Sequence, residues 1–74
     1  MSYFDSILSA VRRAVDMGAS AVWYTDCGKR LSVGRGLDGF GVDVSVNGVQ
    51  IFQHRGLTLR EATAFAAAWV RENS

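Results

Sequence analysis

The chain contains no proline, a single cysteine and a single histidine among its 74 residues. One cysteine, Cys27, cannot form an intrachain disulfide, and one histidine with one cysteine is too few ligands for a structural zinc site. We therefore expect no metal and no cofactor. A chain this short, without such cross-links, has to gain its stability from one core of buried apolar side chains.

An excess of charge and long apolar runs are also lacking. Eight basic and seven acidic side chains give a net charge of +1, so strong non-specific attraction to nucleic acid or to an anionic membrane is not expected. No apolar run approaches the roughly 20 residues of a membrane-spanning helix, and residues 1–5 lack the basic start of a signal peptide. These absences predict a cytoplasmic protein, and a hydrophobic share of 49% predicts a folded one.

Two segments have the apolar spacing of amphipathic helices. In residues 2–17 apolar side chains recur at steps of three and four, with Ser2 as a candidate N-cap and Gly18 suited to the left-handed position after the last turn. Before the second helix, Thr58 and Glu61 have the spacing of a capping box. The apolar stripe of that helix consists of Ala62, Phe65, Ala66, Trp69 and Val70.

Between the helices, β-branched and aromatic residues predict strands over 20–26 and 30–33. Residues 34–41 contain four of the eight glycines and are expected to form a flexible loop. The clearest hairpin signal follows, because the residues from Phe40 to Val46 alternate and Asn47-Gly48 fits a type I′ turn.

This turn sets an expected register for the hairpin. Val49, Ile51 and Gln53 then share a face with the valines of the preceding strand, and Phe52 points to the opposite face. The sequence therefore predicts a single α+β domain over residues 1–74. It has a helix, three or four antiparallel strands and a helix, with both helices packed on the face of valines and isoleucine. The opposite face is partly open and carries Phe52 and one of Trp23 and Tyr24.

No set of residues indicates catalysis. Residues 34–39 match G-x-G-x-x-G, but a dinucleotide-binding motif leaves a strand and opens a helix, whereas a strand is expected to follow here. Cys27, His54 and either Asp26 or Asp43 have no spacing that would join them as nucleophile, base and orienting acid. We therefore predict that the chain is not an enzyme.

Exposed aromatic and arginine side chains on a rigid scaffold are typical of interfaces. The sequence thus favours a small binding module that docks on a protein partner. A homodimer formed through the open sheet face or an exposed strand edge is an alternative. The side chains expected to contact a partner are Phe52, Trp23, Tyr24, Arg30 and Arg35.

Residues 40–48 and 56–62 resemble parts of double-stranded-RNA-binding domains, namely an aromatic-x-Val-x-Val strand with a glycine turn and the turn that leads into the second helix. Tyr24 matches the aromatic residue of that family's first strand. The resemblance implies a helix–sheet–helix order and, as an alternative function, binding of duplex RNA. The arginines available for phosphate contacts are Arg12, Arg13, Arg55 and Arg60.

The second helix departs from that family. The family grips phosphates with lysines at the start of this helix, where the present chain has Leu59, Arg60 and Thr63. Only Arg60 is basic there, and phosphate contacts supply most of such affinity. RNA binding by this chain is therefore expected to be weak.

In size and composition the chain also resembles small phage or mobile-element proteins, anti-CRISPR inhibitors among them. These proteins act by occupying a surface on a larger machine. The resemblance implies an inhibitor or adaptor whose partner is a protein, such as a component of a large nucleoprotein complex. The class shares no motif, so no residue role is implied.

Overall fold

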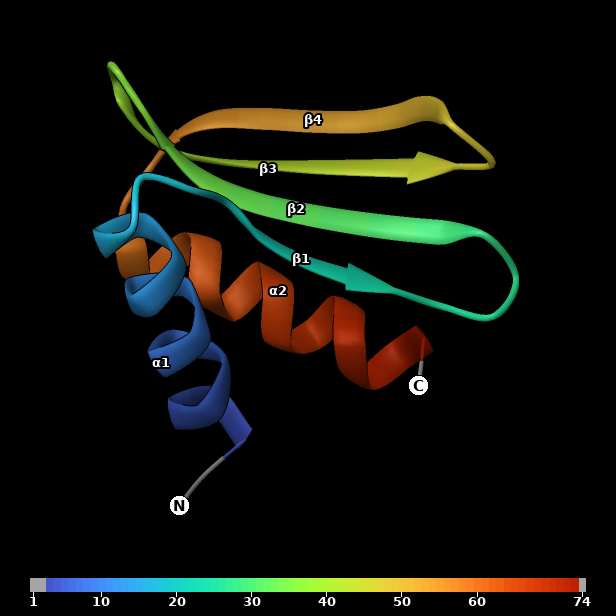
Figure 1. Ribbon diagram of the computed structural model, residues 1–74, viewed down its shortest axis with the longest axis horizontal. Coiled ribbons are helices and arrows are strands. Elements are labelled where there is room, and N and C mark those ends of the chain that lie inside the picture. Colours follow the sequence, from blue (N-terminus) through green and yellow to red (C-terminus); the bar gives the residue numbers. More distant parts are fainter. Residues whose placement is uncertain (1–2, 74) are drawn as a thin grey trace.

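The computed structural model describes residues 3–73 and has one helix at each end of a four-stranded sheet. The elements are α1 (Tyr3–Asp16), β1 (Ala21–Tyr24), β2 (Lys29–Gly36), β3 (Gly39–Val46), β4 (Val49–Leu57) and α2 (Leu59–Asn73). The strands are antiparallel in the order β1-β2-β3-β4, and both helices lie on one side of the sheet (Figure 1). The predicted α+β architecture is confirmed.

The helix ends form as their sequences predict. Gly18 has a φ of 74° and donates its backbone N–H to Val15, while Ala19 donates to Ala14, which together close α1. At the start of α2, Thr58 Oγ1 accepts from the N–H of Glu61 at 3.1 Å and Glu61 Oε1 accepts from the N–H of Thr58 at 2.9 Å. The capping box is confirmed. Ser2, the candidate cap of α1, lies outside the described residues.

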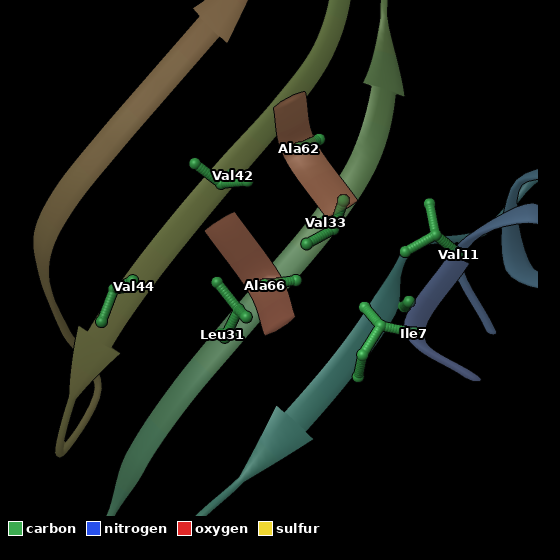
Figure 2. Close-up of a cluster of buried hydrophobic side chains, with 9 residues drawn as sticks. Ile7, Val11, Leu31, Val33, Val42, Val44, Ala62 and Ala66 are labelled. Atoms are coloured by element: carbon green, nitrogen blue, oxygen red, sulfur yellow. The ribbon is translucent and has the colours of Figure 1, made fainter. Parts of the chain in front are cut away.

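The core lies between the helices and the middle of the sheet. Figure 2 shows side chains from β2, β3 and both helices meeting there. Small residues on α2 bring its backbone close to the sheet. The buried core side chains are Ile7, Val11, Ala21, Leu31, Val33, Val42, Val44, Ala62 and Ala66.

Trp23, and not Tyr24, faces the helices. Trp23 pairs with Leu31 and packs against the core, whereas Tyr24 is 74% exposed. Successive side chains of a strand point to opposite faces, so Tyr24 lies on the face away from the helices.

The prediction of a loop over residues 34–41 is wrong. β2 continues through Gly36 and β3 begins at Gly39, with Gly34 paired to Gly41. The antiparallel ladder is held by backbone hydrogen bonds, which a glycine supplies as well as any other residue. The turn itself is therefore reduced to Leu37 and Asp38.

The β3–β4 turn is confirmed, but the register beyond it differs from the prediction. Asn47 and Gly48 have φ values of 51° and 84°, as a type I′ turn requires. The ladder pairs Ser45 with Gln50 as expected and then pairs Val44 with Phe52, so Ile51 is the extra residue of a β-bulge.

The bulge reverses the expected faces. Phe52 lies on the helix side of the sheet, where its ring stacks on Phe65 with centroids 5.3 Å apart and planes at 5°. The expectation that Phe52 points away from the helices is therefore wrong. Val49 and Ile51, which were expected in the core, are 65% and 62% exposed. Stacking of two aromatic rings is favourable, and it offsets the loss of regular pairing at Ile51.

Candidate protein-docking surface

β4 is an edge strand that the helices cover only in part. It is the last strand of the sheet, and α2 packs mainly on β3 and much less on β4. Eight of its nine residues are exposed. The outer edge of β4 and the side chains on it are thus open to another molecule.

β4 is amphipathic, with apolar side chains on the helix side of the sheet and polar side chains on the other side. Val49 and Phe52 lie opposite Val46 and Val44, on the helix side. Polar side chains, Gln50 and Gln53, lie opposite Ser45 and Asp43 on the other side. We call Val49, Ile51 and Phe52 the β4 strip. Exposed apolar groups of this kind mark sites of contact with other molecules.

Phe52 joins the β4 strip to α2. Its side chain is 41% exposed although one ring face lies against Phe65. The ring of His54, two residues along the strand, lies 6.5 Å from that of Phe52 at an angle of 43°. Phe52 is therefore held in place by its neighbours and still presents apolar surface to solvent.

The polar side of β4 carries two ordered contacts. Gln50 Nε2 donates to Asp43 Oδ2 at 2.7 Å. With its amide oriented so that the oxygen faces the guanidinium, Gln53 accepts from Arg55 Nη2 and Nε at 3.1 and 3.3 Å. Beside them lies a shallow hollow whose lining includes Ser32, Gly34, Gly41, Asp43, Gln53 and Arg55.

The structure does not bring the five expected partner-contact residues together. Phe52 and Trp23 lie on the helix side of β4 and β1, the two edge strands, and Trp23 is partly buried. Tyr24 and Arg30 pair across β1 and β2 on the open face and are both exposed. Arg35 is exposed near the β2–β3 turn. Their roles in binding stay predictions.

The four arginines expected to contact RNA are also divided. Arg12 and Arg60 line one small hollow between α1 and α2, where the Arg60 guanidinium carbon lies 6.0 Å from the centre of the Phe4 ring. Arg13 lines another hollow, next to β1. Arg55 lies over Gly41 on the open sheet face. These positions do not form one continuous basic surface.

Cys27 and His54 lie apart on the sheet. Cys27 is exposed in the β1–β2 turn, where its sulfur is 3.3 Å from Thr25 Oγ1. His54 lies opposite Val42 in the middle of the β3–β4 ladder. Within residues 3–73, no three His, Cys, Asp or Glu side chains gather in a way that could hold a metal ion. Neither helix in that range is long and apolar enough to cross a membrane.

Sequence reasoning missed Val49 and Ile51 as surface residues. The adjacent apolar pair Ile51-Phe52 breaks the alternation of the strand, and this break was the signal for a bulge. Comparisons of the chain with protein-family models, curated proteins and solved structures find no significant match.

Proposed function

We propose that this chain is a small non-enzymatic binding module, an inhibitor or adaptor that docks on a protein partner through the β4 strip. The observation that carries the proposal is the exposure of the apolar side chains of β4, which is 65% for Val49, 62% for Ile51 and 41% for Phe52. A strand edge offers backbone groups for pairing, and side chains on alternate positions add specificity.

The rest of the structure holds the proposed docking surface in a fixed shape before a partner binds. The β4 strip lies on an antiparallel sheet that is anchored to a buried core, so little order has to be gained on binding. Phe52 is an aromatic side chain with a fixed ring, which is the type of residue that dominates binding energy in interfaces.

The proposal is tested with the full chain immobilised and exposed to a lysate of the cells that produce it. Ile51→Lys places a charge in the β4 strip, and Met17→Lys places the same charge just after α1, on a side chain that is 78% exposed against 62% for Ile51. We expect wild type and Met17→Lys to retain the same protein and Ile51→Lys to lose it. Retention that is equal in all three, or no retention by wild type, contradicts the proposal.

Duplex RNA binding is a second candidate function, supported by one observation. Arg12 and Arg60 come from different helices and line the same hollow. Titration with a short RNA duplex at two salt concentrations tests it, because affinity that comes from phosphate contacts falls steeply with salt. Wild type should bind more tightly at low salt than Arg12→Ala/Arg60→Ala; no binding at low salt contradicts this candidate.

A further inference from the structure

β4 carries complementary polar groups on one face, at positions on either side of its centre. Gln50 uses its Nε2 to donate to Asp43, which leaves its amide oxygen as an acceptor next to a carboxylate. Arg55, five positions along, donates to Gln53 through Nη2 and Nε and has further N–H groups to offer. Gln53 is the middle residue of the strand, which runs from Val49 to Leu57. The edge therefore has an acceptor before its centre and a donor after it.

We propose that the partner at β4 is a second copy of this chain, whose β4 pairs antiparallel with it about a two-fold axis at Gln53. This inference rests on the proposed function, since it names the occupant of the same strip. The two sheets then form one continuous sheet of eight strands, with four from each copy. All nine residues of each β4 take part, because the axis lies at the middle of the strand.

Complementary hydrogen-bonding groups favour a second copy. An antiparallel pair about Gln53 places residue 55 of one chain opposite residue 51 of the other, beside Gln50. Arg55 then donates to the Gln50 amide oxygen of the second copy, whose other end is held by Asp43. The two-fold repeats this contact, so both guanidinium groups gain an acceptor.

The faces of the paired residues match in the same register, and Arg55 meets Ile51, the extra residue of the bulge. Gln53 meets Gln53 of the second copy on the open side, and Phe52 meets His54 on the helix side. With the axis one residue earlier, at Phe52, the bulge at Ile51 would set Gln50 of the open side against His54 of the helix side. Facing residues have to share a side of the sheet, so the bulge disfavours that alternative.

The length of β4 is also sufficient. Nine residues at roughly 3.3 Å each give a paired edge of about 30 Å, which equals the longest dimension of the chain, 30 Å. Pairing along this edge occupies the outward backbone groups of β4 and places the two α2 helices on the same side of the joined sheet, flanking it. Phe52 and Val49 of each copy then lie beside His54 and Leu57 of the other, on the helix side.

Cysteine cross-linking tests the axis directly. In a Cys27→Ser background, Gln53→Cys places two thiols opposite each other, where Cα atoms of facing antiparallel residues are about 4.5–5.5 Å apart, within disulfide range. The matched control, Cys27→Ser/Gln50→Cys, lies on the same face but roughly 20 Å from its own copy. We expect a covalent dimer on mild oxidation of the first variant only. Equal cross-linking of both variants, or of neither, overturns the proposal.

Light scattering across a range of concentrations supplies a second readout. Wild type and Met17→Lys should reach twice the chain mass of 8.0 kDa, and Ile51→Lys should remain at the mass of one chain. If wild type is monomeric throughout but loses a captured protein on Ile51→Lys, the second copy is wrong and the docking function stands. If neither self-association nor capture depends on Ile51, both proposals fail.

Discussion

β3 takes part in two hairpins, and they differ in how closely they follow the alternation of their sequences. The β2–β3 hairpin pairs without interruption from Lys29 to Gly36, and its buried apolar side chains are Leu31, Val33, Val42 and Val44. The β3–β4 hairpin has register shifts at two places, and its outer strand is exposed. Both contain alternating apolar residues, so alternation alone does not decide burial.

The difference comes from what lies above each strand. α1 packs on β1 and β2, and α2 packs mainly on β3. An apolar side chain is buried only where an element covers its face, so Val42 and Val44 enter the core and Val49 does not. Phe52 of β4 is covered on one ring face by Phe65 of α2 and remains 41% exposed.

The largest effect is expected from matched truncations in the two hairpins. Leu31→Ala removes a fully buried side chain and should cost about 2–5 kcal/mol of unfolding free energy. Ile51→Ala removes an exposed one and should change it by less than about 0.5 kcal/mol. Urea unfolding followed by circular dichroism, at a dilution where the chain is monomeric, measures both. Similar losses of unfolding free energy in the two variants would show that the side chains of the two hairpins do not differ in burial.

Replacing a glycine by alanine should change the unfolding free energy differently at the turns of the two hairpins. Gly48 has a φ of 84°, so Gly48→Ala should cost roughly 1–2 kcal/mol. Gly36, beside the other turn, has no positive φ, and an added Cβ would meet Gly39 O at an ordinary 3.4 Å. Gly36→Ala should therefore be nearly neutral in the same unfolding experiment, and an equal loss in both variants would contradict the assignment of turn strain to Gly48.

Features that depend on neighbouring residues were predictable from the sequence. The caps at Gly18 and Thr58 and the Asn47-Gly48 turn involve backbone geometry and hydrogen bonds within a few residues. The apolar faces of the two helices predicted the two-layer arrangement. Both faces had to be buried, and the sheet offered one apolar face on which the helices could pack. These local signals were enough for the architecture.

Features that depend on distant contacts were not predictable in the same way. The register beyond Gln50 is decided by the stacking of Phe52 on Phe65, which are far apart in the sequence. The face of Trp23 could not be read from Ala21–Tyr24, since all four residues are apolar and none alternates with a polar one. The candidate docking surface follows from both facts, so the sequence named Phe52 for the wrong face and omitted Val49 and Ile51.

A smaller effect is expected where β4 passes into α2. Thr58→Ala removes the side-chain acceptor for the N–H of Glu61 and should cost about 1 kcal/mol. Thr58→Ser keeps that acceptor and serves as the control. Hydrogen exchange should show faster opening of the first turn of α2 and the end of β4, with β2 unchanged. If hydrogen exchange in β2 becomes faster to the same extent, β4 does not open separately from the rest of the sheet.

The pH dependence of the same cap should be smaller still. The N–H of Thr58 and, next, its hydroxyl lower the pKa of Glu61 from its ordinary value of 4.5. A lowered pKa in the folded state means that the stabilisation is present above pH 4.5 and is lost as the pH falls through the folded-state pKa. Wild type should exceed Glu61→Gln in stability at neutral pH, and the difference should disappear in acid. A difference that persists at pH 2 would contradict this origin.

Deletion of Ile51 should have the least effect on the fold. Without it, Gln50 still faces Ser45 and Phe52 still faces Val44, so β4 pairs regularly from Val49 to His54 with the same residues on each side. Because Ile51 is exposed and unpaired in the ladder, the unfolding free energy of the monomer should change by less than about 1 kcal/mol. A large loss of stability would mean that the bulge is needed for folding of β4. A near-neutral result would mean that the fold does not depend on Ile51, which leaves this side chain available for contact with another molecule, unlike the buried side chains of the covered strands.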